Sequence, residues 1–160
     1  MIQKFLVALL TSVSITSYSV PRKPKRLPPS SASTTICQHL GRKALEMTNA
    51  FRAKKRLRKL IWHPGLAEVG RKHSGAMAND IVEFGHDGFQ ERLSHLPIKS
   101  AAENVYMANY ETDLARYAVD GWIQSPGHLK NLVGDFTHCG IGVYKNAEGF
   151  WYFTQIFASF

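Results

Sequence analysis

Four side chains that can do chemistry stand in four short segments of otherwise mostly small and apolar residues. They are His73 in KHSGAMA, His86 in FGHDGF, Glu103 in AAENVYM and His128 in GWIQSPGHLKNL. Imidazole and carboxylate groups are the donors that Zn²⁺ accepts, and histidine also serves acid–base chemistry near neutral pH. The sequence has no short ligand pair such as HExxH or CxxC, so only a fold can bring the four residues together.

Apolar side chains recur at helical spacing in two segments that precede or contain the first of these residues. The first segment predicts an amphipathic helix with one face formed by Ile36, Leu40, Ala44, Met47 and Phe51. The second helix is predicted to begin near Pro64, because proline fits the first turn of a helix. Its buried stripe is expected to consist of Leu66, Val69, His73, Met77 and Ile81.

Two further helices and a hairpin are predicted in the second half of the chain. Thr112 is expected to cap a third helix, and Ser125 and Pro126 to start a short fourth helix that ends near Gly134. His128 then lies in the first turn of that helix. The β-rich segments 139–144 and 150–157 flank a turn and predict a hairpin. Helices followed by terminal strands imply an α+β fold, with helices packed on an antiparallel sheet.

The N-terminal residues differ in composition from the rest of the chain. Residues 1–20 are typical of a secretory signal peptide, with Lys4 before a short apolar stretch and small residues at Ser17 and Ser19. That stretch is too short to span a bilayer, so no transmembrane segment is expected. Residues 21–35, rich in proline, serine and basic side chains, predict an extended linker that can contact anionic surfaces. The folded domain is expected to cover residues 36–160.

More than half of the formal charge of +8 belongs to Lys4 and to the four basic residues of the linker. The domain keeps one dense basic cluster, formed by Arg52, Lys54, Lys55, Arg56, Arg58 and Lys59. No aromatic side chain interrupts this cluster to stack on bases, so we expect no nucleic-acid partner and interpret the cluster as a solvated loop face.

The two cysteines, Cys37 and Cys139, leave two interpretations open. A secreted protein of this kind can carry one long-range disulfide, which would tie the first helix to the hairpin. Two free, buried thiols are the alternative.

Five segments of the chain, in this order, resemble the CAP superfamily, also called SCP domains: LIWHPGLAEVGRKHSGAMA, FGHDGF, AAENVYM, WIQSPGHLKNL and the final HCGIGVY with FWYFTQIFA. The superfamily includes cysteine-rich secretory proteins, insect antigen 5 and plant pathogenesis-related proteins. The chain is most similar to its compact microbial-type members, over residues 36–160. This resemblance implies a three-layer α-β-α sandwich with a mostly antiparallel central sheet and a central cleft.

The resemblance also implies a site. His86, Glu103 and His128 match three places of a His/Glu tetrad that can bind zinc, with His86 and His128 as the metal ligands. Longer members place a second glutamate shortly after the tryptophan that matches Trp122, and this chain has no carboxylate there. His73 matches a histidine that compact members carry instead. We expect the helix N-terminus to lower the pKa of His128, which favours the neutral form that a metal needs.

Two functions follow as hypotheses. The first is a secreted, extracellular module that binds a sterol, fatty acid or other lipid in the cleft, with His73, Glu103, Tyr106 and Trp122 as ligand contacts. The alternative is a hydrolase in which zinc activates water and Glu103 is the general base. We favour the binding module, because no nucleophile–base pair is evident. A defence or host-interaction protein that acts through surface contacts alone is a third class.

Overall fold

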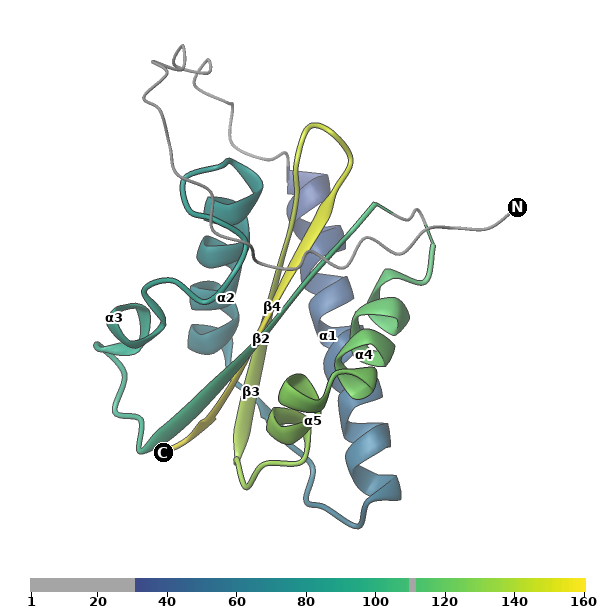
Figure 1. The fold of residues 1–160 in the computed structure, drawn as a ribbon, viewed down its shortest axis with the longest axis vertical. Helices are drawn as coiled ribbons and strands as arrows, with labels where there is room; N and C mark the ends of the chain where they lie inside the picture. Colours follow the sequence, from purple (N-terminus) through teal and green to yellow (C-terminus); the bar gives the residue numbers. More distant parts are fainter. Residues whose placement is uncertain (1–30, 110–111) are drawn as a thin grey trace.

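The computed structural model describes residues 31–109 and 112–160, and its centre is a four-stranded sheet (Figure 1). The strands are β1 (Ile61–Trp62), β2 (Ser100–Ala108), β3 (His138–Lys145) and β4 (Trp151–Ser159), in the order β1-β3-β4-β2. The β2–β4 and β3–β4 pairs are antiparallel, and only the short β1 pairs in parallel with β3. The predicted hairpin is therefore confirmed, and β2 is left at an edge of the sheet.

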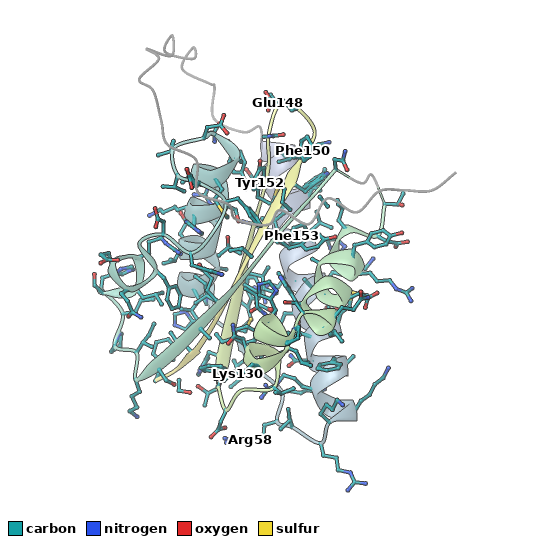
Figure 2. All side chains as sticks on the ribbon, in the orientation of Figure 1. Arg58, Lys130, Glu148, Phe150, Tyr152 and Phe153 are labelled. Atoms are coloured by element: carbon teal, nitrogen blue, oxygen red, sulfur yellow. The ribbon has the colours of Figure 1, made fainter. Side chains whose placement is uncertain are left out.

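Helices cover both faces of this sheet (Figure 1). One face carries α1 (Ser31–Lys54), α4 (Leu114–Gln124) and α5 (Pro126–Leu132), and the other carries α2 (Pro64–Ala78) and α3 (Phe89–Leu93). Neighbouring residues on a strand point to opposite faces. Tyr152 and Phe153 of β4 accordingly belong to different apolar clusters (Figure 2). The α+β class and the three-layer sandwich are confirmed.

Helix α1 begins at Ser31 rather than at Ile36. The predicted face holds from Leu40 onward, because Ala44 is buried and Leu40, Met47 and Phe51 pack partly buried against the core. Ile36 is 53% exposed and does not belong to this face. The helix also buries Cys37, Leu45, Thr48 and Arg52, and a search for apolar periodicity does not find a buried threonine or arginine. The expected signal peptide, and the expected linker as far as residue 30, lie outside the described residues.

Helix α2 begins at Pro64, as predicted, and its first turn is capped by His63. The Nδ1 atom of His63 accepts a hydrogen bond from the Leu66 amide at 3.2 Å. The helix lies very close to β3, because a Cβ atom on Gly142 would come within 1.8 Å of the Arg71 amide nitrogen. The predicted stripe holds as far as Met77, but Ile81 lies beyond the end of the helix and is 74% exposed.

Two helix starts were predicted in the second half of the chain; the first prediction is wrong and the second is confirmed. Thr112 does not cap α4; the N-cap is Asp113, with φ of 52° and no capping side-chain hydrogen bond. Ser125 and Pro126 do start α5, which ends at Leu132. The Gly134 amide donates to the carbonyl of Asn131, two residues beyond the last helical residue, so the predicted end is close to the observed one.

Of the two interpretations of Cys37 and Cys139, the structure supports the second: no disulfide is formed, and both residues are free, buried thiols. Cys37 lies beside the backbone of Lys145, at the end of β3, whereas Cys139 is near the start of the same strand. Burial raises the pKa of both thiols, so both remain protonated near neutral pH. The length of β3 therefore separates the two sulfur atoms too far for a bridge.

Within the described part of the chain, no helix combines the length and the apolar character needed to cross a membrane.

Candidate functional site

The predicted site residues gather around β2, and two neighbours on that strand serve its two faces. Glu103 lies among residues of α2 and α3, because its side chain contacts His73 and Arg92. Asn104 faces α5 instead and bonds there to Asn131. The alternation of strand side chains thus connects the edge of the sheet to both helical layers.

Glu103 is the centre of the polar cluster. Its Oε1 atom lies 3.0 Å from Nδ1 of His86, in the segment between α2 and α3. Arg92 of α3 donates from Nη1 to Oε2 at 2.7 Å and from Nη2 to Oε1 at 3.0 Å. The Glu103 side chain is only 2% exposed. It is therefore a buried carboxylate with a bidentate arginine and an imidazole as partners, the strongest type of ionic hydrogen bonding in proteins.

These partners decide the charge of Glu103. Burial by itself raises the pKa of a carboxyl group, because it penalises the charged form. The hydrogen bonds from His86 and Arg92, together with the positive charge of Arg92, outweigh burial and lower the pKa of Glu103 below its usual value. Glu103 is thus ionised near neutral pH.

The ionised carboxylate determines which nitrogen of the His86 ring carries the proton of their contact. A carboxylate can only accept hydrogen bonds, so the proton of the 3.0 Å contact is on Nδ1 of His86. In the neutral ring, Nε2 then carries the free lone pair. The His86 side chain is 52% exposed, so this lone pair belongs to a partly exposed ring and is available to a ligand. A carboxylate that holds Nδ1–H in this way is the usual outer partner of a histidine that binds metal.

His73 has a different part in the site. Its Nε2 atom lies 2.8 Å from the carbonyl oxygen of Gly85, and because a carbonyl only accepts, Nε2 is the donor. Burial lowers the pKa of His73, although this hydrogen bond opposes the shift. His73 therefore anchors the residue that precedes His86, and its Nε2 is not available to a metal.

His128 lies in the first turn of α5, as predicted. Its pKa is lowered, first by burial and then by the nearby charge of His86. The direction matches our expectation, but burial and His86 account for the shift rather than the helix N-terminus. The effect of His86 on this pKa indicates that the two imidazoles lie in the same region of the molecule.

A chain of buried amides holds α5 against β2. The Nδ2 atom of Asn131 donates to the Glu103 carbonyl at 3.1 Å and to Oδ1 of Asn104 at 2.8 Å. Asn104 donates to Oε1 of Gln155 at 3.1 Å, and Gln155 donates to Oγ1 of Thr48 at 3.0 Å. The chain runs from α5 through β2 and β4 to α1, so it positions the helix that carries His128.

The C-terminal end of α5 is also held by Arg52, which the sequence placed in the solvated basic cluster. That assignment is wrong for this residue, because Arg52 is only 2% exposed. Its Nη1 atom donates to the carbonyls of Leu132 and Gly134 at 2.8 and 2.9 Å, and its Nε donates to that of Arg58. Arg52 thus satisfies carbonyl groups at the C-terminal end of α5, which a helix leaves without intrahelical donors.

Two of the expected ligand contacts lie on the other face of β2 from Glu103. Trp122 is fully buried, and its Nε1 donates to the Val105 carbonyl at 3.1 Å. Tyr106 is half-buried and packs edge-on against Trp122 and Phe153. Both belong to the core between the sheet and α4. His73 and Glu103 are together, but the four residues do not form one surface.

Sequence reasoning missed Arg92, Asn131 and Gln155. Arg92 follows the FGHDGF segment closely, but the sequence analysis predicted no helix there, and the short helix that places Arg92 was found only in the structure. Asn131 lies three residues after His128 in the segment GWIQSPGHLKNL, which puts both on neighbouring positions of α5. Gln155 lies in a strand whose pattern is otherwise apolar, and nothing local marks its partners.

The donor set restricts what metal can bind. Among residues 31–109 and 112–160, no three or more His, Cys, Asp or Glu side chains are grouped in a way that could hold a metal ion. Glu103 already has His86 and Arg92 as partners, and His73 donates from Nε2 to Gly85. His86 and His128 remain as the two imidazoles that a metal could use, and two ligands alone do not make a closed structural site.

Comparisons with known proteins identify the family and the fold. The model of the cysteine-rich secretory protein family (CAP) matches residues 45–157. An uncharacterized membrane protein of Bacillus subtilis, YlbC, is 37% identical over 120 residues, which are 71% of this chain but 32% of that protein. The chain therefore spans about a third of the length of this curated relative.

Solved structures show the same fold. An extracellular protein from Bacillus anthracis that contains an SCP domain superposes with a TM-score of 0.70 and 28% identity, over 84% of this chain and 45% of that one. A cysteine-rich secretory protein from Staphylococcus aureus superposes with a TM-score of 0.62 and 23% identity, over 76% of this chain and 39% of that one.

Proposed function

The chain belongs to the cysteine-rich secretory protein (CAP) family, and on that premise we propose that it is an exported module that binds a sterol or other lipid beside Glu103 and His86. Export is supported by the N-terminal composition and by two relatives, one described as extracellular and one as a membrane protein. The single observation that carries the ligand class is an exposed apolar surface next to the histidines.

That apolar surface continues from the polar cluster along the same face of the sheet. Met107 of β2, Tyr152 of β4 and Tyr144 of β3 lie in register across three strands. The Phe84 ring lies 6.5 Å from that of Tyr152. Met107 is 41% exposed and Phe84 is 48% exposed. Exposed apolar surfaces that adjoin polar groups typically bind ligands, partners or membranes.

The surface has a length that suits an elongated apolar ligand. Glu103 and Met107 share one face of β2 and are four residues apart, which corresponds to about 13 Å along a strand. Phe84 is two residues before His86, so it lies at the junction of the apolar and polar parts. We expect the apolar body of a lipid to contact Met107 and Phe84, and its polar end to meet the imidazole of His86.

Zinc fits the polar end as a cofactor. His86 and His128 would hold the ion through their neutral imidazoles, with Glu103 as the outer partner of His86. A bound zinc ion would supply a positive charge, or a Lewis acid, to the polar group of the ligand. The chain's own contribution is the orientation of His86 by Glu103 and of His128 by the amide chain behind α5.

Hydrolysis with Glu103 as general base is the weaker alternative. A general base must accept a proton, whereas Glu103 is buried, has a lowered pKa and holds Arg92 through both oxygens. The carboxylate is better suited to holding His86 than to taking a proton from water.

The proposal is tested by titrating the protein with a fluorescent sterol and a fluorescent fatty acid. Met107→Ser and Phe84→Ser should each weaken binding about tenfold, because each removes about 1–2 kcal/mol of apolar contact. Ile36→Ser is the matched control, because Ile36 is similarly exposed but lies on α1. No saturable binding of either probe, or equal affinity in all variants, would contradict the proposal.

A further inference from the structure

The connection between α1 and β1 displays a group of basic side chains at one end of the molecule. Segments 54–59 and 130–135 contain six of the fifteen lysines and arginines of residues 31–160, but one of their twelve aspartates and glutamates. The six basic residues, which are all exposed and are called here the basic surface, are Lys54, Lys55, Arg56, Arg58, Lys59 and Lys130. The carboxylate is that of Asp135, which pairs with Arg58 at 3.0 Å. Positive charge is therefore concentrated at this end and not spread evenly over the domain.

The main chain beneath the basic surface is held in place by two polar side chains of α1. The Nε atom of Arg52 donates to the Arg58 carbonyl at 2.9 Å, and the Leu57 amide donates to the Arg52 carbonyl at 3.0 Å. Asn49 bonds to both main-chain groups of Leu60, because its Nδ2 donates to the carbonyl at 3.0 Å and its Oδ1 accepts from the amide at 2.8 Å. A partner therefore meets a segment that is already ordered, which lowers the entropy cost of binding.

Arg52 also joins the two segments that form the basic surface. Its Nη1 atom donates to the carbonyls of Leu132 and Gly134 at the end of α5, while its Nε donates to that of Arg58. Lys130 lies in the last turn of α5, so the same contacts bring it to the loop that carries Arg58. Figure 2 shows Arg58 and Lys130 at the same end of the molecule. One buried guanidinium thus holds together two segments that are far apart in the sequence.

Aliphatic side chains accompany the basic ones, and they indicate the kind of anionic partner. Val133 is 36% exposed and lies between Leu132 and Gly134, whose carbonyls both bind Arg52. Leu57, in the middle of the basic loop, is half-buried. Neither segment contains an aromatic residue that could stack on nucleic-acid bases. Positive side chains around exposed aliphatic groups suit the interface of an anionic bilayer, where the headgroups attract the charges and the region beneath them accepts the aliphatic groups.

We propose that the basic surface docks the protein on an anionic lipid bilayer. Its lysines and arginines contact the phosphate groups of the lipids, and Val133 enters the headgroup layer between them. This contact uses none of the residues proposed to bind a sterol or fatty acid. Tyr152, which belongs to the apolar surface, lies toward the other end of the molecule from Arg58 and Lys130 (Figure 2). Docking through the basic surface therefore leaves that end away from the bilayer and open to a ligand.

The proposal is tested by sedimenting the full chain with vesicles of phosphatidylcholine alone and with vesicles of phosphatidylcholine and phosphatidylglycerol in equal parts. Binding is expected to the anionic vesicles only, and it should weaken as salt is added, because salt screens exposed charges. The double variant Lys54→Gln/Lys59→Gln should bind about thirtyfold more weakly, because each lysine close to an anionic surface contributes about fivefold. Val133→Ser should weaken binding about threefold, because it removes part of an apolar contact.

Lys43→Gln/Lys72→Gln is the matched control, because it removes the same charge from exposed lysines of α1 and α2 that lie outside both segments. It should leave vesicle affinity nearly unchanged. Equal losses in the two double variants would overturn the proposal, because they would assign the attraction to net charge or to the basic residues before residue 31. No binding to anionic vesicles, equal binding to neutral ones, or tighter binding of a DNA duplex at the same phosphate concentration would also overturn it. Unchanged affinity of Val133→Ser would refute the insertion of Val133.

Discussion

Arg92 donates hydrogen bonds from both terminal nitrogens to the carboxylate of Glu103, and that carboxylate also accepts a hydrogen bond from Nδ1–H of His86. Arg92 of α3 therefore orients the Glu103 side chain of β2. Glu103 in turn orients the His86 ring, which is available to a ligand. Breaking the first contact should therefore disturb the last one, and this can be measured.

Replacing Arg92 with glutamine should reduce the free energy of unfolding by about 3–5 kcal/mol, because it leaves a buried carboxylate without its cation. Chemical denaturation near pH 7 measures this change. Arg116→Gln is the control, because Arg116 forms an exposed pair with Asp120 and should cost at most about 1 kcal/mol. A loss in Arg92→Gln no larger than in the control would show that the pair is not stabilising.

The same pair predicts how stability changes with pH. The folded-state pKa of Glu103 is lowered, so its contribution is fully present above the unfolded-state value of about 4.3. The contribution is lost as pH falls through the folded-state pKa. In Arg92→Gln the pKa of Glu103 should rise, so acid unfolding should begin at a higher pH. Denaturation midpoints of both proteins between pH 3 and 7 test this, and parallel curves would contradict it.

Zinc affinity should depend on His86 and His128 and not on the exposed His95. Replacing either of the first two with alanine should weaken zinc binding at least about tenfold, whereas His95→Ala should have no effect. Affinity should also fall as pH drops through the imidazole range near 6.5, because only the neutral ring binds metal. Calorimetric titration measures both effects, with circular dichroism to check folding. Equal zinc affinity in all variants would show that His86 and His128 do not bind the ion.

His63 should make α2 sensitive to acid. Its Nδ1 accepts from the Leu66 amide, and burial, followed by the charge of His138, lowers its pKa. The folded state thus favours neutral His63, so this contribution is present above the unfolded-state value of about 6.5 and is lost as pH falls below it. His63→Ala should cost about 1 kcal/mol at pH 7.5, and His63→Asn should restore most of it, because asparagine is a good N-cap. Denaturation at pH 7.5 and 5.5 tests this; an equal pH response of wild type and His63→Asn would refute it.

Arg52 should be far more important for stability than its neighbours in the basic cluster. Arg52→Gln removes donors from three carbonyl groups and should cost about 2–4 kcal/mol. Lys54→Gln, two residues further along α1, should change stability by less than about 0.5 kcal/mol. Thermal unfolding distinguishes the two, and similar melting temperatures would show that Arg52 is an ordinary surface charge.

Local patterns in the sequence predicted the elements better than their buried faces. Pro64 and Ser125–Pro126 identified two helix starts correctly, because proline at a first turn and serine at an N-cap have local causes. The predicted face of α1 is correct at Ala44 and wrong at Ile36, and it missed the buried Thr48, whose hydroxyl accepts a hydrogen bond from Gln155, far away in the sequence. Contacts that form only in the tertiary structure leave no periodic pattern in the sequence.

The site residues show the same contrast between local patterns and tertiary contacts. Segment resemblance identified His86, Glu103 and His128, which lie in recognisable segments. It did not identify Arg92, because a bidentate contact depends on how α3 lies against β2. The pairing of Cys37 and Cys139 stayed open for a similar reason: Cys139 lies near the start of β3, and Cys37 lies beside the end of the same strand.

Glu103 and Asn104 are adjacent in sequence, yet their contacts reach opposite layers of the molecule. Glu103 orients His86, and Asn104 holds α5, which carries His128, so two consecutive residues of one strand help to position both histidines. A substitution at either strand position should therefore disturb one histidine and leave the other in place.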